Sequence, residues 1–362
     1  MATPLRNLLV TLTILSSLQG FTQTHTPRYV SMANYTNGYY EYLPKGYDPA
    51  GATLYPMILF LHGGGDVGDG SPEQLPRLLK VGLTKQINNG DFPSSFTVNG
   101  KNFSFIIISP QFTQLPPKDD AVSSIGTILN YVLQHYKVDP TRIYLTGLSK
   151  GGGNVFDYVG KNATNANKVA AIVTSAEASY PDHAQARTIA AANLPVWATH
   201  NQGDPDISVN YTIDYINMIN EAPAPNPLAK KTIFPGSGHD AWTQTYWQEW
   251  RENGMNIYEW MLQYQRLSVI TPIPAPPVNP VGLTLSPVPA KNQMELTLTG
   301  VDKGSFTAEI YSSTGALVQQ LTLQKQNNTF QKTVLLNGLP AGLYFLKVQF
   351  GNNKTIRAFI KN

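Results

Sequence analysis

The chain has 362 residues, no cysteine, six histidines and a formal net charge of +3. This length allows one large domain and a small one. The lack of cysteine excludes disulfides, thiol catalysis and thiolate metal sites. The small net charge and the absence of a Lys/Arg cluster argue against nucleic-acid binding. The histidines are scattered and form no His-Glu-x-x-His pattern, so we expect neither a metal site nor a cofactor.

The N-terminus has the layout of a secretory signal peptide. Arg6 supplies a positive start, an apolar run follows over residues 8–15, and small and polar residues continue to Gln23. No segment reaches the ~20 apolar residues of a membrane helix, so we expect no membrane span. The pattern predicts a signal peptide over residues 1–23, and the alternative is a buried N-terminal helix or strand.

Between residues 24 and 268, short apolar runs alternate with stretches of helical periodicity. Apolar residues recur at helical spacing over residues 123–136 and 246–265. The short runs are typical of strands that are buried on both faces. The alternation predicts an α/β fold with a doubly wound, mostly parallel sheet. The predicted strands are 56–61, 105–108, 142–145, 169–173, 195–198 and 231–234.

A proline-rich stretch separates a second region. Five prolines lie between residues 271 and 280 and favour an extended spacer. We therefore expect a catalytic domain at 24–268, a linker at 269–281 and a C-terminal domain at 282–362. Short β-prone segments with turn signals between them predict that this last domain is a small all-β sandwich. These segments are 282–285, 294–298, 306–311, 317–318 and 344–348.

The candidate nucleophile is Ser149. Residues 147–151 read Gly-Leu-Ser-Lys-Gly and fit the G-x-S-x-G nucleophile elbow. The motif alone is weak evidence, but here a predicted strand enters it, and two further glycines and a short helical pattern follow. Flanking glycines let the strand and the helix approach each other without a clash between Cβ atoms. The alternative is a glycine-rich turn with an incidental serine.

A serine hydroxyl needs a base, and this elbow belongs to a fold that orders its triad as serine, acid, histidine. His239 lies in a turn after a predicted strand and before the last predicted helix, which makes it the candidate base. His200 follows the strand 195–198 and is interpreted as structural. His183 lies in a polar stretch and is interpreted as exposed.

The acid must lie between the serine and the histidine, at the end of a strand. Asp204 and Asp206 both qualify. We favour Asp204, whose role would be to hold the imidazole tautomer and to stabilise the imidazolium. Asp206 remains an alternative, and either residue could instead be a loop or N-cap aspartate before a helix near Ser208. Asp240 is a weaker candidate because it adjoins the histidine.

Residues 62–65 read His-Gly-Gly-Gly and follow the predicted strand that ends at Leu61. This pattern matches a type of oxyanion loop in which glycines leave backbone N–H groups free to face the substrate. We assign the oxyanion hole to the N–H groups of Gly64 and Lys150. The alternative, a nucleotide phosphate loop, lacks the G-x-G-x-x-G spacing with a helix directly behind it.

Residues 38–266 resemble a family of extracellular bacterial α/β-hydrolases. The family is described as the phospholipase/carboxylesterase type, as predicted peptidases, or as relatives of feruloyl esterases and polyhydroxybutyrate depolymerases. The resemblance implies an α/β-hydrolase fold and a triad of Ser149, Asp204 and His239. Two departures are Lys150, where Met is usual, and Asn201, where Gly is usual, and the Lys150 charge leaves the substrate type open. The stretches that carry the resemblance are 42–48, 60–63, 109–111, 138–149, 200–206 and 238–242.

The C-terminal region is similar to the sorting domain of the bacterial type IX secretion system. The stretches 287–290, 311–315 and 339–348 carry this resemblance, above all Leu-Pro-Ala-Gly-x-Tyr at 339–344. It implies export across the inner membrane by the signal peptide and across the outer membrane by the C-terminal domain. Secretion machinery would then be a partner, and the protein would be secreted or held at the cell surface. The alternative is a carbohydrate-binding β-sandwich.

These expectations combine into a secreted serine esterase that works through an acyl-enzyme. By analogy with secreted relatives, its substrate would be a feruloyl or acetyl ester on plant polysaccharide. Alternatives are a serine peptidase that cleaves short peptides and a polyhydroxyalkanoate depolymerase. A non-catalytic surface binding protein is also possible in principle, but the intact set of serine, acid and histidine argues against it.

Overall fold

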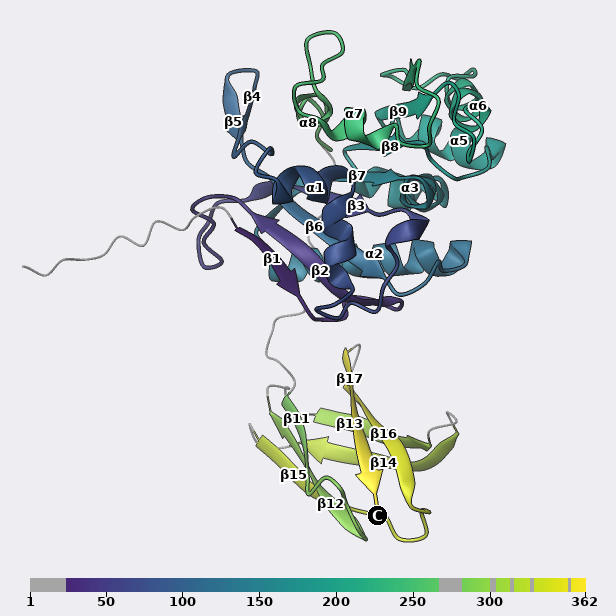
Figure 1. Cartoon of the computed structure of the whole chain (residues 1–362). Helices are drawn as coiled ribbons and strands as arrows, with labels where there is room; N and C mark the ends of the chain where they lie inside the picture. The colour runs from purple at the N-terminus through teal and green to yellow at the C-terminus, as the bar shows by residue number, and fades with distance from the viewer. Residues whose placement is uncertain (1–23, 267–281, 300–303, 313–315, 326–328, 351–352) are drawn as a thin grey trace, which may run out of the picture. The chain divides into compact units, whose positions relative to one another are not determined.

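The computed structural model describes residues 24–266, 282–299, 304–312, 316–325, 329–350 and 353–362 (Figure 1). The chain forms two compact units that divide between Pro272 and Ile273. The predicted signal peptide at 1–23 and the linker at 269–281 lie outside the described residues. Both therefore stay predictions, together with the exact ends of the two domains.

Within residues 24–266, eight strands form one sheet. Their bounds are β1 Thr24–Arg28, β2 Thr36–Leu43, β3 Tyr55–Leu61, β6 Ile106–Phe112, β7 Val138–Leu148, β8 Ala171–Ser175, β9 Val196–Asn201 and β10 Lys230–Phe234. The order across the sheet is β1-β2-β6-β3-β7-β8-β9-β10. The strands from β6 to β10 pair in parallel, whereas β2 pairs antiparallel with β1 and β6. This order confirms the predicted mostly parallel sheet and adds two N-terminal strands that the apolar runs did not indicate.

Strand β3 shows why the apolar runs predicted this sheet. Met57 and Leu59 belong to a buried cluster that also includes residues of α2, α3, α5 and α6, and Ile58 and Phe60 belong to a second cluster with residues of α1, α7 and α8. A strand that is covered on both faces is apolar throughout rather than alternating. The helices are α1 Gly82–Asn88, α2 Lys118–His135, α3 Lys150–Gly160, α4 Ala163–Lys168, α5 His183–Ala191, α6 Asn210–Ile219, α7 Trp242–Tyr246 and α8 Ile257–Leu262.

Shorter elements complete this unit. Two 3-10 helices precede α1, and a small hairpin follows it. No helix in the described part of the chain is long and apolar enough to cross a membrane. The short elements are η1 Gly64–Asp66, η2 Leu75–Lys80, β4 Phe96–Val98 and β5 Lys101–Phe103.

The prediction of one helix over residues 246–265 is wrong. Helix α7 ends at Tyr246, a loop follows, and only the short helix α8 lies within this range. In that loop Asn253 has φ 55° and Gly254 has φ 80°, and this left-handed backbone cannot continue a helix. Asn256 then opens α8 with a capping box. The apolar spacing misled because Trp250 packs against the core from the loop rather than from a helix.

The C-terminal unit consists of two antiparallel sheets, ordered β11-β12-β15 and β14-β13-β16-β17. Leu296 of the first sheet and Ile310 and Leu346 of the second belong to one buried apolar cluster. This arrangement confirms the predicted all-β sandwich. The strands are β11 Gly282–Ser286, β12 Gln293–Thr299, β13 Gly304–Ser312, β14 Leu317–Lys325, β15 Thr329–Leu335, β16 Gly342–Phe350 and β17 Asn353–Lys361.

The parallel strands of the larger sheet bring the predicted functional residues to one edge. Because β3, β7, β9 and β10 run in the same direction, the loops that follow them lie at the same end of the sheet (Figure 1). Those loops carry Gly64, Ser149, Asp204 and His239 in turn. The fold therefore brings residues that are up to 175 positions apart to one end of the sheet.

Candidate active site

Ser149 lies at the tight turn between β7 and α3. Its backbone has φ 50° and ψ −123°, a conformation that is strained for a residue with a Cβ. The loop after β8 holds this conformation with two hydrogen bonds. The Ser149 N–H donates to the Ser175 carbonyl at 2.9 Å, and the Ala178 N–H donates to the Ser149 carbonyl at 2.9 Å.

The glycines of the elbow are required by close contact between backbone segments. A Cβ added to Gly151 would lie 2.1 Å from the Leu61 carbonyl oxygen. A Cβ added to Gly147 would lie 2.5 Å from the carbonyl carbon of Gly151. Helix α3 therefore packs too closely against β7, which enters the elbow, and against the neighbouring strand β3 for any side chain at these two positions.

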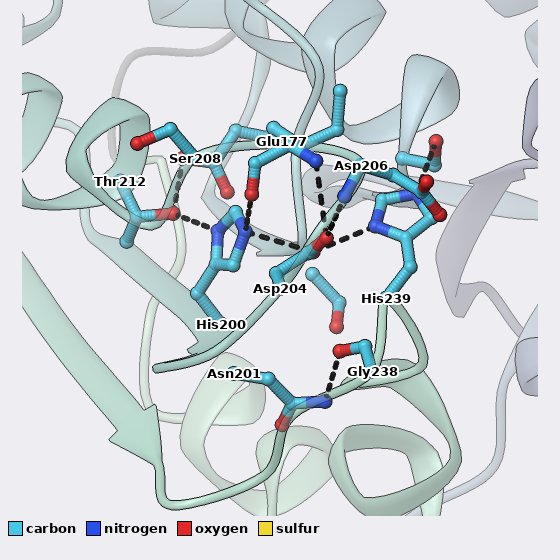
Figure 2. Close-up of polar contacts among 12 residues, drawn as sticks. Glu177, His200, Asn201, Asp204, Asp206, Ser208, Thr212, Gly238 and His239 are labelled. Carbon is cyan, nitrogen blue, oxygen red and sulfur yellow. Dashed lines mark hydrogen bonds and ion pairs between the residues drawn. The ribbon is translucent and has the colours of Figure 1, made fainter.

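Ser149, His239 and Asp204 form a line of hydrogen bonds. His239 Nε2 lies 2.9 Å from Ser149 Oγ, and His239 Nδ1 lies 2.7 Å from Asp204 Oδ2. Figure 2 shows the second of these contacts. The Asp204 side chain is fully buried, whereas the His239 side chain is 19% exposed. In this geometry the serine hydroxyl donates to Nε2, and the Nδ1 hydrogen is donated to the carboxylate.

Asp204 is held as a carboxylate by backbone donors as well as by His239. Its Oδ1 accepts hydrogen bonds from the N–H groups of Asp206 at 2.9 Å and Ile207 at 3.0 Å. Burial acts to raise the pKa of Asp204, but these hydrogen bonds and the one from His239 hold it below its usual value. Of the two candidate acids, Asp204 is the one whose side chain bonds to the histidine. The Asp206 side chain is exposed.

The His-Gly-Gly-Gly loop lies against the nucleophile. A Cβ added to Gly63 would lie 3.5 Å from the Cβ of Ser149. Gly64 is the first residue of η1 and Lys150 is the first residue of α3. N–H groups at the start of a helix have no acceptor within that helix. Both N–H groups assigned to the oxyanion hole are therefore free of helical hydrogen bonds, beside the serine.

His62 fixes this loop to the sheet. Its Nε2 accepts a hydrogen bond from the Phe112 N–H at 2.9 Å, so the ring hydrogen is on Nδ1, which donates to the Gly63 carbonyl at 2.7 Å. Burial lowers the pKa of His62 to about 4, so the ring is neutral at neutral pH. The histidine of this motif thus sets the backbone position of the loop.

Four further residues adjoin the catalytic residues or the His-Gly-Gly-Gly loop, either by contact or in sequence. The Trp242 ring meets His239 edge to face, with 5.0 Å between centroids. Leu115, which is 52% exposed, lies over Gly64. Lys150 is half-buried at the start of α3. Burial raises the pKa of Asp66, at the end of the oxyanion loop, to about 6. The surroundings of the serine therefore combine apolar walls with two ionisable groups.

Behind Asp204, the line of hydrogen bonds continues through three more buried side chains (Figure 2). We had not predicted from the sequence that they belong to the site. They are His200 at the end of β9, Thr212 in α6 and Glu177 in the loop after β8. His200 was interpreted as structural, and Glu177 and Thr212 were not singled out. The available signals were the four-residue spacing from His200 to Asp204 and the place of Glu177 just beyond a predicted strand. No pattern in the sequence indicates Thr212.

The other candidate residues lie outside the hydrogen-bonded line. The His183 side chain is 62% exposed and pairs with Glu221 at 2.8 Å, which confirms its interpretation as an exposed residue. Asp240 accepts hydrogen bonds from the N–H and the hydroxyl of Thr243 at the start of α7. Its side chain therefore bonds to the first turn of α7.

One group in the described part of the chain has metal-ligand geometry. Asp204, Asp206 and His239 each offer a ligand atom, and these atoms lie within 4.8 Å of one another. His239 uses Nδ1 on Asp204 at 2.7 Å and Nε2 on Ser149 at 2.9 Å. A metal bound by either nitrogen would have to break one of these bonds, so the residues fit a proton-transfer site better than a metal site.

Comparison with known proteins identifies the C-terminal unit. Residues 284–362 match the family model of the secretion system C-terminal sorting domain. The smaller unit is therefore a sorting domain, as its sequence indicated. None of the curated proteins that were compared matches the chain.

Solved structures resemble the larger unit. The carboxylesterase Cest-2923 from Lactobacillus plantarum is 15% identical, with 65% of this chain and 90% of that chain covered and a TM-score of 0.44. Esterase 2 from Thermogutta terrifontis is 15% identical, with 60% and 85% covered and a TM-score of 0.41. Est1E from Butyrivibrio proteoclasticus is 14% identical, with 58% and 90% covered and a TM-score of 0.39. The strand order and the elbow of this chain themselves define an α/β-hydrolase fold.

Proposed function

We propose that this protein is an exported serine hydrolase that cleaves carboxylic esters. The observation that carries the proposal is the line from Ser149 Oγ through His239 to Asp204, with contacts of 2.9 and 2.7 Å. A serine that is strained at an elbow, with a base in hydrogen-bond reach and a buried acid behind that base, is the arrangement that nucleophilic catalysis needs.

The geometry supports a two-step reaction. Ser149 Oγ attacks the ester carbonyl while His239 Nε2 takes its proton, and the N–H groups of Gly64 and Lys150 stabilise the oxyanion. His239 then gives the proton to the leaving alcohol, and water releases the acyl group by the same route. Asp204 holds the Nδ1 hydrogen of His239 and stabilises the imidazolium. No step needs a metal or a cofactor.

We infer that the substrate is a feruloyl or acetyl ester on plant polysaccharide. The sorting domain supports a substrate outside the cell, because it directs the protein to export. The partial exposure of the catalytic histidine supports access for an ester that is attached to a large polymer. The edge of Trp242 beside His239 offers an apolar surface on which an aromatic acyl group could pack.

A substrate panel tests this proposal. The purified protein and its Ser149→Ala variant are assayed on p-nitrophenyl acetate, methyl ferulate, acetylated xylan, a polyhydroxybutyrate film and an unstructured peptide. We expect turnover of the phenolic or sugar esters by the native protein and a loss of at least about 10³-fold in the variant. Turnover of the peptide alone would replace the ester assignment. Turnover of the film alone would keep the ester assignment but replace the polysaccharide ester as the substrate. Failure of a fluorophosphonate to label Ser149 in folded protein would indicate a binding protein.

A further inference from the structure

A chain of buried polar groups runs from Asp204 into the interior between β8, β9 and α6. His200 Nε2 lies 3.1 Å from Asp204 Oδ2, and His200 Nδ1 lies 2.7 Å from Thr212 Oγ1. The same Thr212 hydroxyl lies 2.5 Å from Glu177 Oε1. His200, Thr212 and Glu177 are each 0% exposed, so solvent cannot complete their hydrogen bonds. Figure 2 shows the continuous path.

The surroundings of His200 decide where its hydrogen is. Its Nε2 faces two acceptors, the Asp204 carboxylate and the Ile207 carbonyl, each at 3.1 Å. Nε2 must therefore carry a hydrogen, because a bare ring nitrogen would face two oxygens with no donor between them. In a neutral ring, Nδ1 then has no hydrogen and must accept one from Thr212.

The same reasoning extends to Glu177. Thr212 has one hydroxyl hydrogen, and if it is donated to His200 the hydroxyl oxygen must be the acceptor toward Glu177 at 2.5 Å. The carboxyl group of Glu177 then has to be protonated to donate. If Glu177 were ionised instead, the Thr212 hydrogen would point to it and His200 would have to be an imidazolium.

We propose that Glu177, Thr212 and His200 form a one-way relay of hydrogen bonds that orients the catalytic acid Asp204. In this relay neutral Glu177 donates to Thr212, Thr212 donates to His200, and His200 donates to Asp204. The inference rests on the proposed hydrolase function, because it assigns positioning residues to that site. None of the three side chains faces the substrate.

The surroundings favour the neutral arrangement over a buried ion pair. Glu177 is contacted by Gly152 of α3, by Thr212 of α6 and by Thr174 of β8, whose hydroxyl donates to Oε2 at 3.5 Å. Through Thr212 it is linked to His200 of β9, and Tyr215 of α6 is near enough to interact with it electrostatically. No Lys or Arg is among them. Burial raises the pKa of Glu177 to about 7 and lowers that of His200. Both shifts oppose ionisation, as expected where two charges would have to leave water.

The relay gives Asp204 a fourth donor. Two backbone N–H groups hold Oδ1, and His239 and His200 share Oδ2. A carboxylate with this many donors has one orientation, and that orientation sets the direction of the His239 ring. Loss of the relay should therefore lower kcat and leave KM nearly unchanged.

Substitutions at Thr212 and Glu177 test the relay. We expect Thr212→Val, which keeps the shape and removes the hydroxyl, to lower kcat about tenfold, the worth of one hydrogen bond. Thr212→Ser should restore the rate. At pH 6, Glu177→Gln should keep most of the rate because its amide donates as the acid does, whereas Glu177→Leu should lose it. Thr84→Val removes an equally buried hydroxyl from α1 and is the matched control for stability.

Two results would overturn the proposal. One is a native kcat in Thr212→Val. The other is an equal loss of kcat in Glu177→Gln and Glu177→Leu, because neither glutamine nor leucine can replace an ionised carboxylate. A measurement without substrate separates this inference from the proposed function. Long-range 1H–15N NMR spectra, with His200→Gln used for assignment, should show His200 as the neutral Nε2–H tautomer at pH 6. An imidazolium signal would contradict the relay even in a protein with no esterase activity.

Discussion

At the scale of single residues, the site is organised around one carboxylate. Asp204 receives hydrogen bonds from His239 on one side and from backbone N–H groups and His200 on the others. Asp206 contributes its N–H to the same carboxylate but keeps its own side chain in solvent. The two aspartates therefore have different roles, although they are only two positions apart.

The first prediction separates these two aspartates. Asp204→Asn should lower kcat by about 10³- to 10⁴-fold, because an amide disturbs the His239 tautomer while it keeps the shape of the acid. Asp206→Asn should stay within about threefold of the native protein, since it removes only a surface charge. Steady-state kinetics on p-nitrophenyl acetate measure both. A larger loss in the second variant would make Asp206 the acid.

The second prediction concerns stability and pH. Burial raises the pKa of Glu177 from 4.5 to about 7, so the folded state holds this proton more tightly than the unfolded state does. The stabilisation is complete below pH 4.5 and is lost as pH rises through about 7, with a size of about 3 kcal/mol. Glu177→Gln removes this pH-dependent stabilisation, because glutamine does not titrate.

Urea unfolding at pH 4.5, 6 and 7.5 checks this expectation. The unfolding free energy of the native protein should fall with pH relative to that of Glu177→Gln. If the unfolding free energies of the two proteins changed with pH in parallel, the Glu177 carboxyl group would have its ordinary pKa in the folded state.

The site residues that could be predicted are those for which a chemical requirement coincides with a local sequence motif. Ser149 stands in a five-residue motif, and His239 follows a strand in the order that the motif requires. Thr212 has no such signal, and Glu177 has only its place beyond a predicted strand, because a helix threonine and a loop glutamate are most often exposed. Only the packing of β8, β9 and α6 turns them inward and brings them to His200.

At the scale of elements, the elbow depends on backbone contact more than on side chains. We expect Gly151→Ala to destabilise the protein by at least about 3 kcal/mol, because its Cβ would meet a rigid carbonyl oxygen. Gly65→Ala is the matched control, since a Cβ there has no atom within 4 Å. Thermal unfolding measures both variants. Equal melting temperatures would show that the strand and the helix can separate without cost.

The elements also show where periodicity misleads. The parallel strands were predicted because burial on both faces makes them apolar throughout. The helix predicted over 246–265 was wrong because apolar residues in a loop can reach the same core as those in a helix. Backbone signals at Asn253 and Gly254 were present, but their effect depends on φ values that spacing does not report.

At the scale of the whole molecule, the chain combines a unit with the α/β-hydrolase fold and a sorting domain. Each unit has its own buried core, so we expect catalysis and export to be separable. A chain that stops at residue 272 should retain the kcat of the full protein but remain in the cell that makes it. Esterase activity in culture medium and in cell fractions measures both effects. Activity in the medium without residues 273–362 would show that the sorting domain is not needed for export.

The sequence by itself predicted the buried parallel strands, the serine elbow, the candidate base and the sorting domain. These features are local, because burial on two faces, glycine at close contacts and turn residues leave marks within a few positions. Only the tertiary structure decided that Asp204 bonds to His239, that the predicted C-terminal helix is broken, and that Glu177, Thr212 and His200 lie behind the acid. Those contacts join segments that are distant along the chain, and they follow from how sheet and helices pack rather than from any pattern of neighbours.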